Sequence, residues 1–142
     1  MNEESKLTAE HRGGKYDKAI NDFFEKMQLN TNQQAMFYLG RMLNIVEFIQ
    51  KGKKKTVIDK VNFNGIDRDD IQRLRVSLIE KAKQYNKIAK VVFTDRKFGE
   101  IFDYNNWNMN PQEAIFFTMT GYSFGISTAD AIRLEENEQN NQ

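Results

Sequence analysis

Apolar residues recur along most of the chain at the three- and four-residue spacing of amphipathic helices. Residues 15–28 carry one such stripe, and residues 67–85 carry another that falls within about 140° of the helical wheel. Residues 33–52 are apolar on more than one face, which predicts a central helix ending at Gly52. The pattern predicts an all-α fold, a compact helical bundle of four to six helices.

Two later helices have start signals. Asn110 is predicted to cap a helix whose first position is Pro111, a residue already shaped for that place. Thr94 is predicted to cap a short helix that contains Phe98. A last helix, capped by Ser127 or Thr128, is expected to run to Leu134.

Residues 56–66 fit two interpretations. The alternating Val57, Val61 and Phe63 are compatible with a short strand, whereas the glycine and asparagines of the segment favour a loop. An irregular or β-like segment is therefore expected here, and both alternatives stay open.

Length and local composition predict one folded domain. Residues 1–14 are polar and end in a glycine pair, which favours a flexible N-terminal extension. Residues 15–134 are expected to form a single helical-bundle domain, and residues 135–142 a disordered tail.

The least charged stretch, "NPQEAIFFTMTGYSFG" at residues 110–125, is too short and too often interrupted by polar residues to span a membrane. It is expected to be the packed spine of the bundle. Gly121 and Gly125 would let a neighbouring helix approach closely. Alternatively, these glycines serve a subunit interface, which would leave Tyr122 or Phe124 partly exposed.

Several classes of chemistry have no support in the sequence. The absence of cysteine excludes disulfides and thiolate metal sites, and the charged start lacks a secretory signal, so a cytoplasmic location is expected. There is no phosphate-binding glycine loop, zinc-binding helix motif or nucleophilic serine elbow. The single histidine, His11, lies in a polar segment. We therefore expect a protein that is not an enzyme, with no catalytic residue, metal or cofactor.

Charge is segregated although the net charge is only +1. Residues 51–97 carry fourteen Lys and Arg against six Asp and Glu, a net charge of +8, and residues 98–142 carry −6. A block of this kind indicates a basic face for an anionic partner, with a solvated helix surface as the alternative. The predicted nucleic-acid-binding positions are Lys51, Lys53, Lys54, Lys55, Lys60, Arg73, Lys83, Lys87 and Lys90.

Three residues near this block allow more than one interpretation. Arg75 falls inside an apolar arc, so it either extends its side chain outward or contacts another subunit. Tyr85 and Phe93 are able to stack on unpaired bases, although aromatic residues at helical spacing are more often part of a core. Arg75, Tyr122 and Phe124 are the predicted partner-interface residues.

Three segments together resemble a known family: "AMFYLGRMLNIVEFIQKGKKK" (35–55), "VNFNGIDRDDIQRLRVSLIEKAKQY" (61–85) and "NPQEAIFFTMTGYSFG" (110–125). In order and spacing they are similar to the C-terminal helical region of the large subunit of type I-B CRISPR effector complexes. That region is also made alone as the small subunit of the complex. The likeness spans roughly residues 20–128.

The resemblance implies a non-catalytic small subunit of a crRNA-guided Cascade complex. Such a subunit would bind the target or displaced DNA strand through its basic surface, independently of sequence, and stabilise the R-loop. Its implied partners are the backbone and large subunits, single-stranded target DNA and copies of itself, and no membrane. The alternative is a purely structural scaffold subunit without direct nucleic-acid contact.

Overall fold

The computed structural model describes residues 18–50, 52–85 and 88–124. Contacts divide the chain into two units that meet between Asn30 and Thr31, and each unit is described by itself. The predicted N-terminal extension, last helix and C-terminal tail lie outside the described residues. The single domain over residues 15–134 stays a prediction.

In the first unit, residues 18–27 form a helix. Gln28 follows with a positive φ of 54°, and the amide of Leu29 donates to the carbonyl of Phe24 at 3.1 Å. A residue in the left-handed region is a common way to end a helix. The helix predicted over residues 15–28 is thus confirmed across its described part.

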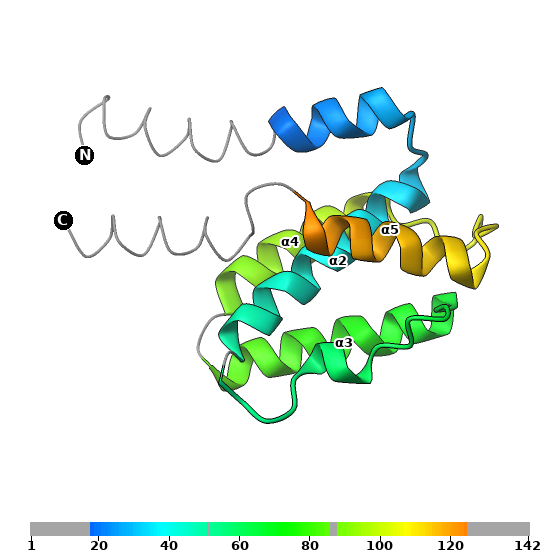
Figure 1. The fold of residues 1–142 in the computed structure, drawn as a ribbon. Helices are drawn as coiled ribbons and strands as arrows, with labels where there is room; N and C mark the ends of the chain where they lie inside the picture. Colours follow the sequence, from blue (N-terminus) through cyan, green and yellow to red (C-terminus); the bar gives the residue numbers. More distant parts are fainter. Residues whose placement is uncertain (1–17, 51, 86–87, 125–142) are drawn as a thin grey trace, which may run out of the picture. The chain divides into compact units, whose positions relative to one another are not determined.

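The second unit is built from helices packed on one another (Figure 1). Its elements are α2 (Thr31–Ile49), the 3-10 turn η1 (Val57–Lys60), α3 (Arg68–Gln84), α4 (Ile88–Ile101) and α5 (Pro111–Ser123). The described residues contain no strand, so the predicted all-α fold is confirmed. Within the same ranges, no helix combines the length and the apolar character needed to cross a membrane.

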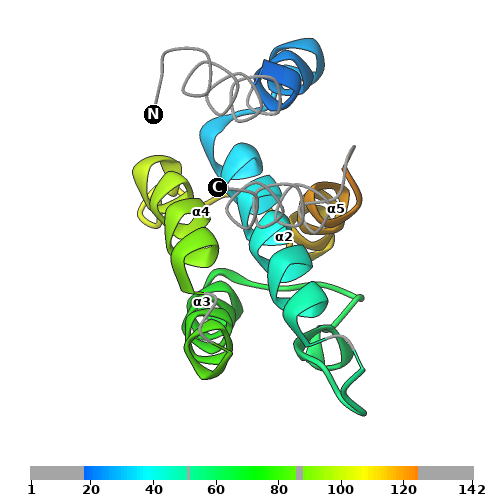
Figure 2. The same ribbon diagram turned by 90° about the vertical axis from the view of Figure 1, so that its left-hand side faces the viewer.

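The central element is α2, as its apolar pattern predicts. It contacts α5, α4, α3 and η1, and Figure 2 shows it running between α4 and α5. Several of its large apolar side chains, including Phe37, Leu39 and Leu43, are fully buried. Burial of several such residues on one helix supplies much of the hydrophobic stabilisation of the unit.

Two glycines let α2 and α5 touch backbone to backbone. A Cβ on Gly40 of α2 would collide with the carbonyl oxygen of Thr118 and lie 2.6 Å from the amide nitrogen of Tyr122. A Cβ on Gly121 of α5 would collide with the carbonyl oxygen of Phe37. The prediction that Gly121 allows close helix approach is therefore correct, and Gly40 is its counterpart on α2. Gly125 lies outside the described residues.

The cap predicted for α5 is confirmed, and α3 begins with a cap of the same kind. The Asp67 side chain accepts from the amide of Asp70, and the Asn110 side chain accepts from the amide of Glu113. Pro111 occupies the start of α5. These local signals were sufficient because a cap involves only groups within one helical turn.

Thr94 does not cap a helix, so that prediction was wrong. It lies inside α4, which begins at Ile88, and its hydroxyl donates to the carbonyl of Lys90 at 3.0 Å. This bond back to the preceding turn lets a threonine sit in a helix interior. Val91 and Phe98, fully buried seven residues apart, extend the same apolar face on both sides of Thr94.

The segment 56–66 is irregular and contains a 3-10 turn where a short strand was the alternative. The amide of Val57 donates to the side-chain oxygen of Gln50 at 2.8 Å, and the amide of Thr56 donates to the Asp59 carboxylate at 2.9 Å. Side chains thus satisfy the backbone groups that a strand would have paired. Val57 is buried while Phe63 is exposed, so the alternation does not produce one buried face.

We predict that Gly40→Ala lowers the free energy of unfolding by about 1–3 kcal/mol, because the new methyl group must push α5 away from α2. Urea denaturation followed by circular dichroism measures the change. Gly99→Ala is the matched control, since its Cβ would meet only a guanidinium nitrogen of Arg75 at 3.8 Å. The control should be neutral or stabilise by up to about 1 kcal/mol. Equal stability of both variants would show that the helices are not held at backbone contact.

Candidate nucleic-acid interface

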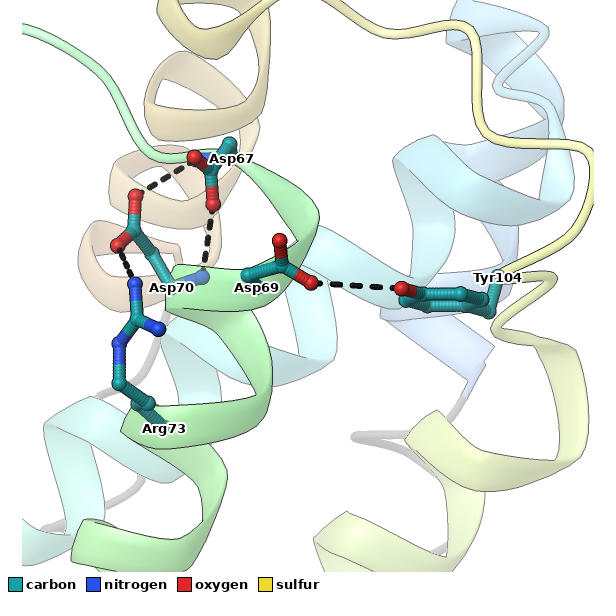
Figure 3. Close-up of polar contacts among 5 residues, drawn as sticks. All are labelled: Asp67, Asp69, Asp70, Arg73 and Tyr104. Atoms are coloured by element: carbon teal, nitrogen blue, oxygen red, sulfur yellow. Dashed lines mark hydrogen bonds and ion pairs between the residues drawn. The ribbon is translucent and has the colours of Figure 1, made fainter.

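The N-terminal end of α3 is acidic and internally bonded (Figure 3). The amide of Asp70 donates to the Asp67 carboxylate at 2.8 Å, and the amide of Asp67 donates to the Asp70 carboxylate at 3.0 Å. The Arg73 guanidinium donates to the other oxygen of Asp70 at 2.5 Å. Asp69 accepts from the hydroxyl of Tyr104 at 3.3 Å. The carboxylates at this end complement the positive end of the helix dipole.

The same contacts fix the charge states of Asp70 and Arg73. The hydrogen bond from the Asp67 backbone, with a smaller effect of the Arg73 side chain, lowers the pKa of Asp70. The hydrogen bond to Asp70 raises the pKa of Arg73. Both groups are charged at neutral pH and neutralise one another. Arg73 was predicted to bind nucleic acid, but the structure places it in the acidic part of the helix with an intramolecular partner.

The opposite end of α3 is basic. Lys53, Lys54 and Lys55 are exposed in the segment after α2, and Lys83 is exposed in the last turn of α3. The Lys53 ammonium lies 5.8 Å from the centroid of the Tyr85 ring, which places the lysine-rich segment beside the end of α3. We call these four lysines, together with Tyr85, the basic end.

The cations of the basic end have no acidic partner in the described part of the chain. The ion pairs found there join Arg73 to Asp70 and Arg75 to Asp95, and neither involves a lysine of the basic end. In Figure 1, α2 and α3 both end on the left-hand side, so two negative helix ends face this region. They favour the lysines there without neutralising their full charge, which leaves a cationic surface open to a polyanion.

The remaining predicted lysines fall in different places. Lys60 is exposed at the end of η1, and Lys90 is half-buried in the first turn of α4. Lys51 and Lys87 lie outside the described residues. The structure therefore places Lys53 of the exposed lysine segment at the end of α3 that also carries Lys83, and it places Arg73 toward the other end of that helix.

Arg75 has partners within the chain. Its Nε donates to the Asp95 carboxylate at 2.7 Å, and its guanidinium carbon lies 4.4 Å from the centroid of the Phe98 ring. Both charged side chains are about three-quarters buried. These contacts join α3 to α4 and explain why an arginine lies in the apolar arc; a contact with another subunit stays a prediction.

Tyr122 and Phe124 are half-buried at the end of α5. The carbonyl of Tyr122 accepts from the Asn44 side chain at 3.2 Å, and burial, with a smaller effect of Glu47, raises the pKa of the Tyr122 hydroxyl. Phe124 lines an open, mostly apolar groove on the outer side of α5. Gly121 of the same helix serves the contact with α2. A role of Tyr122 and Phe124 in a partner interface stays a prediction.

Lys97 is a candidate that sequence reasoning missed. Its ammonium lies 5.3 Å from the centroid of the Phe93 ring and 5.9 Å from that of Tyr38. The signal was the four-residue spacing of Phe93 and Lys97, which places two side chains on one face of a helix. This spacing was overlooked because a helix that begins after a cap at Thr94 would not include Phe93.

Comparison with known proteins gives one family. The family model for the C-terminal domain of CRISPR-associated protein TM1802 matches residues 1–138 of the chain. No curated protein and no solved structure matches the chain. The matched range includes all three segments that carry the resemblance, and a type I-B subunit fits this family.

We predict that Asp70→Asn destabilises the protein at pH 7 by up to about 1 kcal/mol, because the charged partner of Arg73 and of the helix dipole is lost. The lowered pKa means that the carboxylate stabilises the fold fully above its unfolded pKa of about 3.9, and less as the pH falls through the folded value. Thermal unfolding at pH 7 and below pH 4 measures both effects.

The difference between wild type and Asp70→Asn should therefore shrink in acid. Asp69→Asn is the control, since it also removes one first-turn carboxylate and weakens the longer bond to Tyr104, but keeps the cap and the pair of Asp70 with Arg73. A pH-independent difference would contradict an electrostatic role for Asp70.

Proposed function

Because the chain belongs to the family of the C-terminal domain of CRISPR-associated protein TM1802 and has a role in CRISPR defence, we propose that it is a DNA-binding small subunit of a crRNA-guided complex. The observation that carries the proposal is the basic end, where the exposed segment Lys53–Lys55 reaches the end of α3 through the contact of Lys53 with Tyr85, two residues after the exposed Lys83. Its partners within the complex are the backbone and large subunits and further copies of itself.

The geometry suits binding to phosphates and gives little means of reading bases. Flexible exposed lysines act as point charges, and each neutralised phosphate releases counterions. Affinity from this source is largely independent of sequence and falls steeply with salt. In a guide-directed complex, base pairing with the RNA selects the target, so the subunit need only hold the strand.

Modest contacts are sufficient for this role. The heteroduplex formed with the guide is about as stable as the DNA duplex that it replaces, so protein contacts to the backbone tip the exchange. A few lysines that bind the target or displaced strand would keep the R-loop open. This role requires no catalytic group, and we propose a non-catalytic subunit.

The structure narrows the candidate surface. Arg73 was grouped with the lysines by its position on the helical wheel, which compares angles and ignores distance along the axis. Ten residues separate Arg73 from Lys83, or about 15 Å at the rise of an α-helix. The proposed site therefore consists of the basic end alone, because Lys60 and Lys90 lie on η1 and α4.

We predict that changing Lys53, Lys54 and Lys55 together to Glu weakens binding of the full chain to single-stranded DNA by at least about tenfold at low salt. The dependence of log affinity on log salt should also become shallower by about two units, because three phosphate contacts are lost. Fluorescence anisotropy with a labelled oligonucleotide over a salt series measures both.

A pair of single substitutions on α3 gives the matched control. Lys83→Gln removes one charge from the basic end, whereas Arg73→Gln removes one charge from the acidic end of the same helix. We expect weaker DNA binding from the first and unchanged binding from the second. Equal effects would mean that net charge, and not the basic end, determines affinity.

The same triple variant tests the scaffold alternative. If the lysines meet acidic surfaces of neighbouring subunits, the variant should fail to co-purify with the complex while the isolated chain keeps its DNA affinity. That outcome would contradict the DNA-binding proposal and support a structural role.

A further inference from the structure

Phe93 is an aromatic residue on the outer surface of α4. Its side chain is 52% exposed, although the two residues that anchor the helix, Val91 and Phe98, are fully buried. Two residues after Val91, Phe93 points about 200° away from it around the helix. The ring is thus excluded from the core by the helical register.

An exposed phenylalanine is common by itself and needs no explanation. What distinguishes Phe93 is its electrostatic setting. The Lys97 ammonium lies 5.3 Å from the ring centroid, Lys90 is one turn earlier on the helix, and Arg96 is exposed on the same element. Proteins that bind single-stranded nucleic acids combine aromatic rings, on which bases stack, with neighbouring cations that contact the phosphates.

We propose that Phe93 is a stacking surface for an unpaired base of the strand held by the basic end. This inference rests on the proposed function, and it specifies the ligand as single-stranded nucleic acid. The exposed part of the ring stacks on a base, and the exposed Arg96 on the next turn attracts the adjoining phosphate. Stacking of this kind tolerates any sequence, because every base has a π-face.

The position of α4 allows one strand to contact both the basic end and Phe93. α3 ends at Gln84 and α4 begins at Ile88, so the first turn of α4 lies at the same end of the helix pair as Lys83. From Lys90 to Lys97 the helix rises by about 10 Å, with Phe93 between them. A strand that leaves the basic end along α4 meets a cation, a ring and a second cation in turn.

Tyr85 does not offer the same surface. It is half-buried, whereas Phe93 is 52% exposed. Phe93 is therefore the better of the two aromatic candidates near the basic block. The rival explanation for Phe93 is a protein contact, since its neighbour Val92 is also 37% exposed.

The test compares two probes of equal charge on the full chain. One is an oligothymidine of about 20 nucleotides, and the other is an abasic oligonucleotide of the same length. We expect Phe93→Ala to weaken binding of oligothymidine by about tenfold and to leave binding of the abasic strand unchanged, because only the first probe has bases to stack.

Three further variants separate stacking from apolar contact. Phe93→Trp should keep or improve affinity for oligothymidine, and its fluorescence should be quenched by the bound bases relative to wild type, whose one tryptophan is Trp107. Phe93→Leu keeps an apolar side chain without a ring and should bind like Phe93→Ala. Val92→Ala is the neighbouring control and should bind like wild type.

The results also separate this inference from the function on which it rests. Wild-type binding by Phe93→Ala and Phe93→Leu, with weak binding by the triple lysine variant, would overturn the stacking role and leave the DNA-binding proposal intact. Equal loss for both probes in Phe93→Ala would overturn stacking as well. If the triple lysine variant binds like wild type, both proposals fail.

Discussion

The close contact between α2 and α5 is the constraint on which the second unit depends. Gly40 and Gly121 remove the Cβ atoms that would otherwise separate the helices, so each glycine lies against the backbone of the other helix. Dispersion contacts weaken quickly with distance, and backbones at van der Waals contact therefore gain more than helices held apart by side chains. The remaining helices pack on the central member of this pair.

Polar side chains of α2 complete the same contact. The Arg41 guanidinium is almost fully buried and donates to the carbonyls of Gly121 at 3.3 Å and Phe124 at 2.9 Å, and Asn44 donates to Tyr122. These carbonyls lie at the C-terminal end of α5, where the helix supplies few donors of its own; the Phe124 amide also donates to Gly121 at 3.4 Å. Burial lowers the pKa of Arg41 to about 10, so the side chain stays charged at neutral pH and can satisfy them.

The proposed function follows from how this frame positions helix ends. Because α2 is central and α3 packs on it, the segment after α2 reaches the end of α3, where the Lys53 ammonium lies over the Tyr85 ring. Asp67, Asp69 and Asp70 lie at the other end of α3, where they complement the helix dipole and Asp70 pairs with Arg73, while Glu80 lies one turn before Lys83. The α4 helix continues from the basic side toward Phe93.

The sequence alone determined the features that depend on neighbouring residues: helical periodicity, the helix from Asp67, the cap at Asn110, and a central segment rich in lysine. Caps and periodicity are decided within one or two turns, so they can be read without the fold. The start of α4 was misjudged because a threonine can bond to the preceding turn as well as cap the next one.

Tertiary structure alone decided which charges act together. It placed Arg75 against Asp95, matched Gly40 to Gly121 and left Phe93 outside the core. A helical wheel reports angles about one axis, whereas electrostatic and stacking interactions depend on distances between helices. Those distances are set by packing between residues far apart in the chain, and local pattern does not contain them.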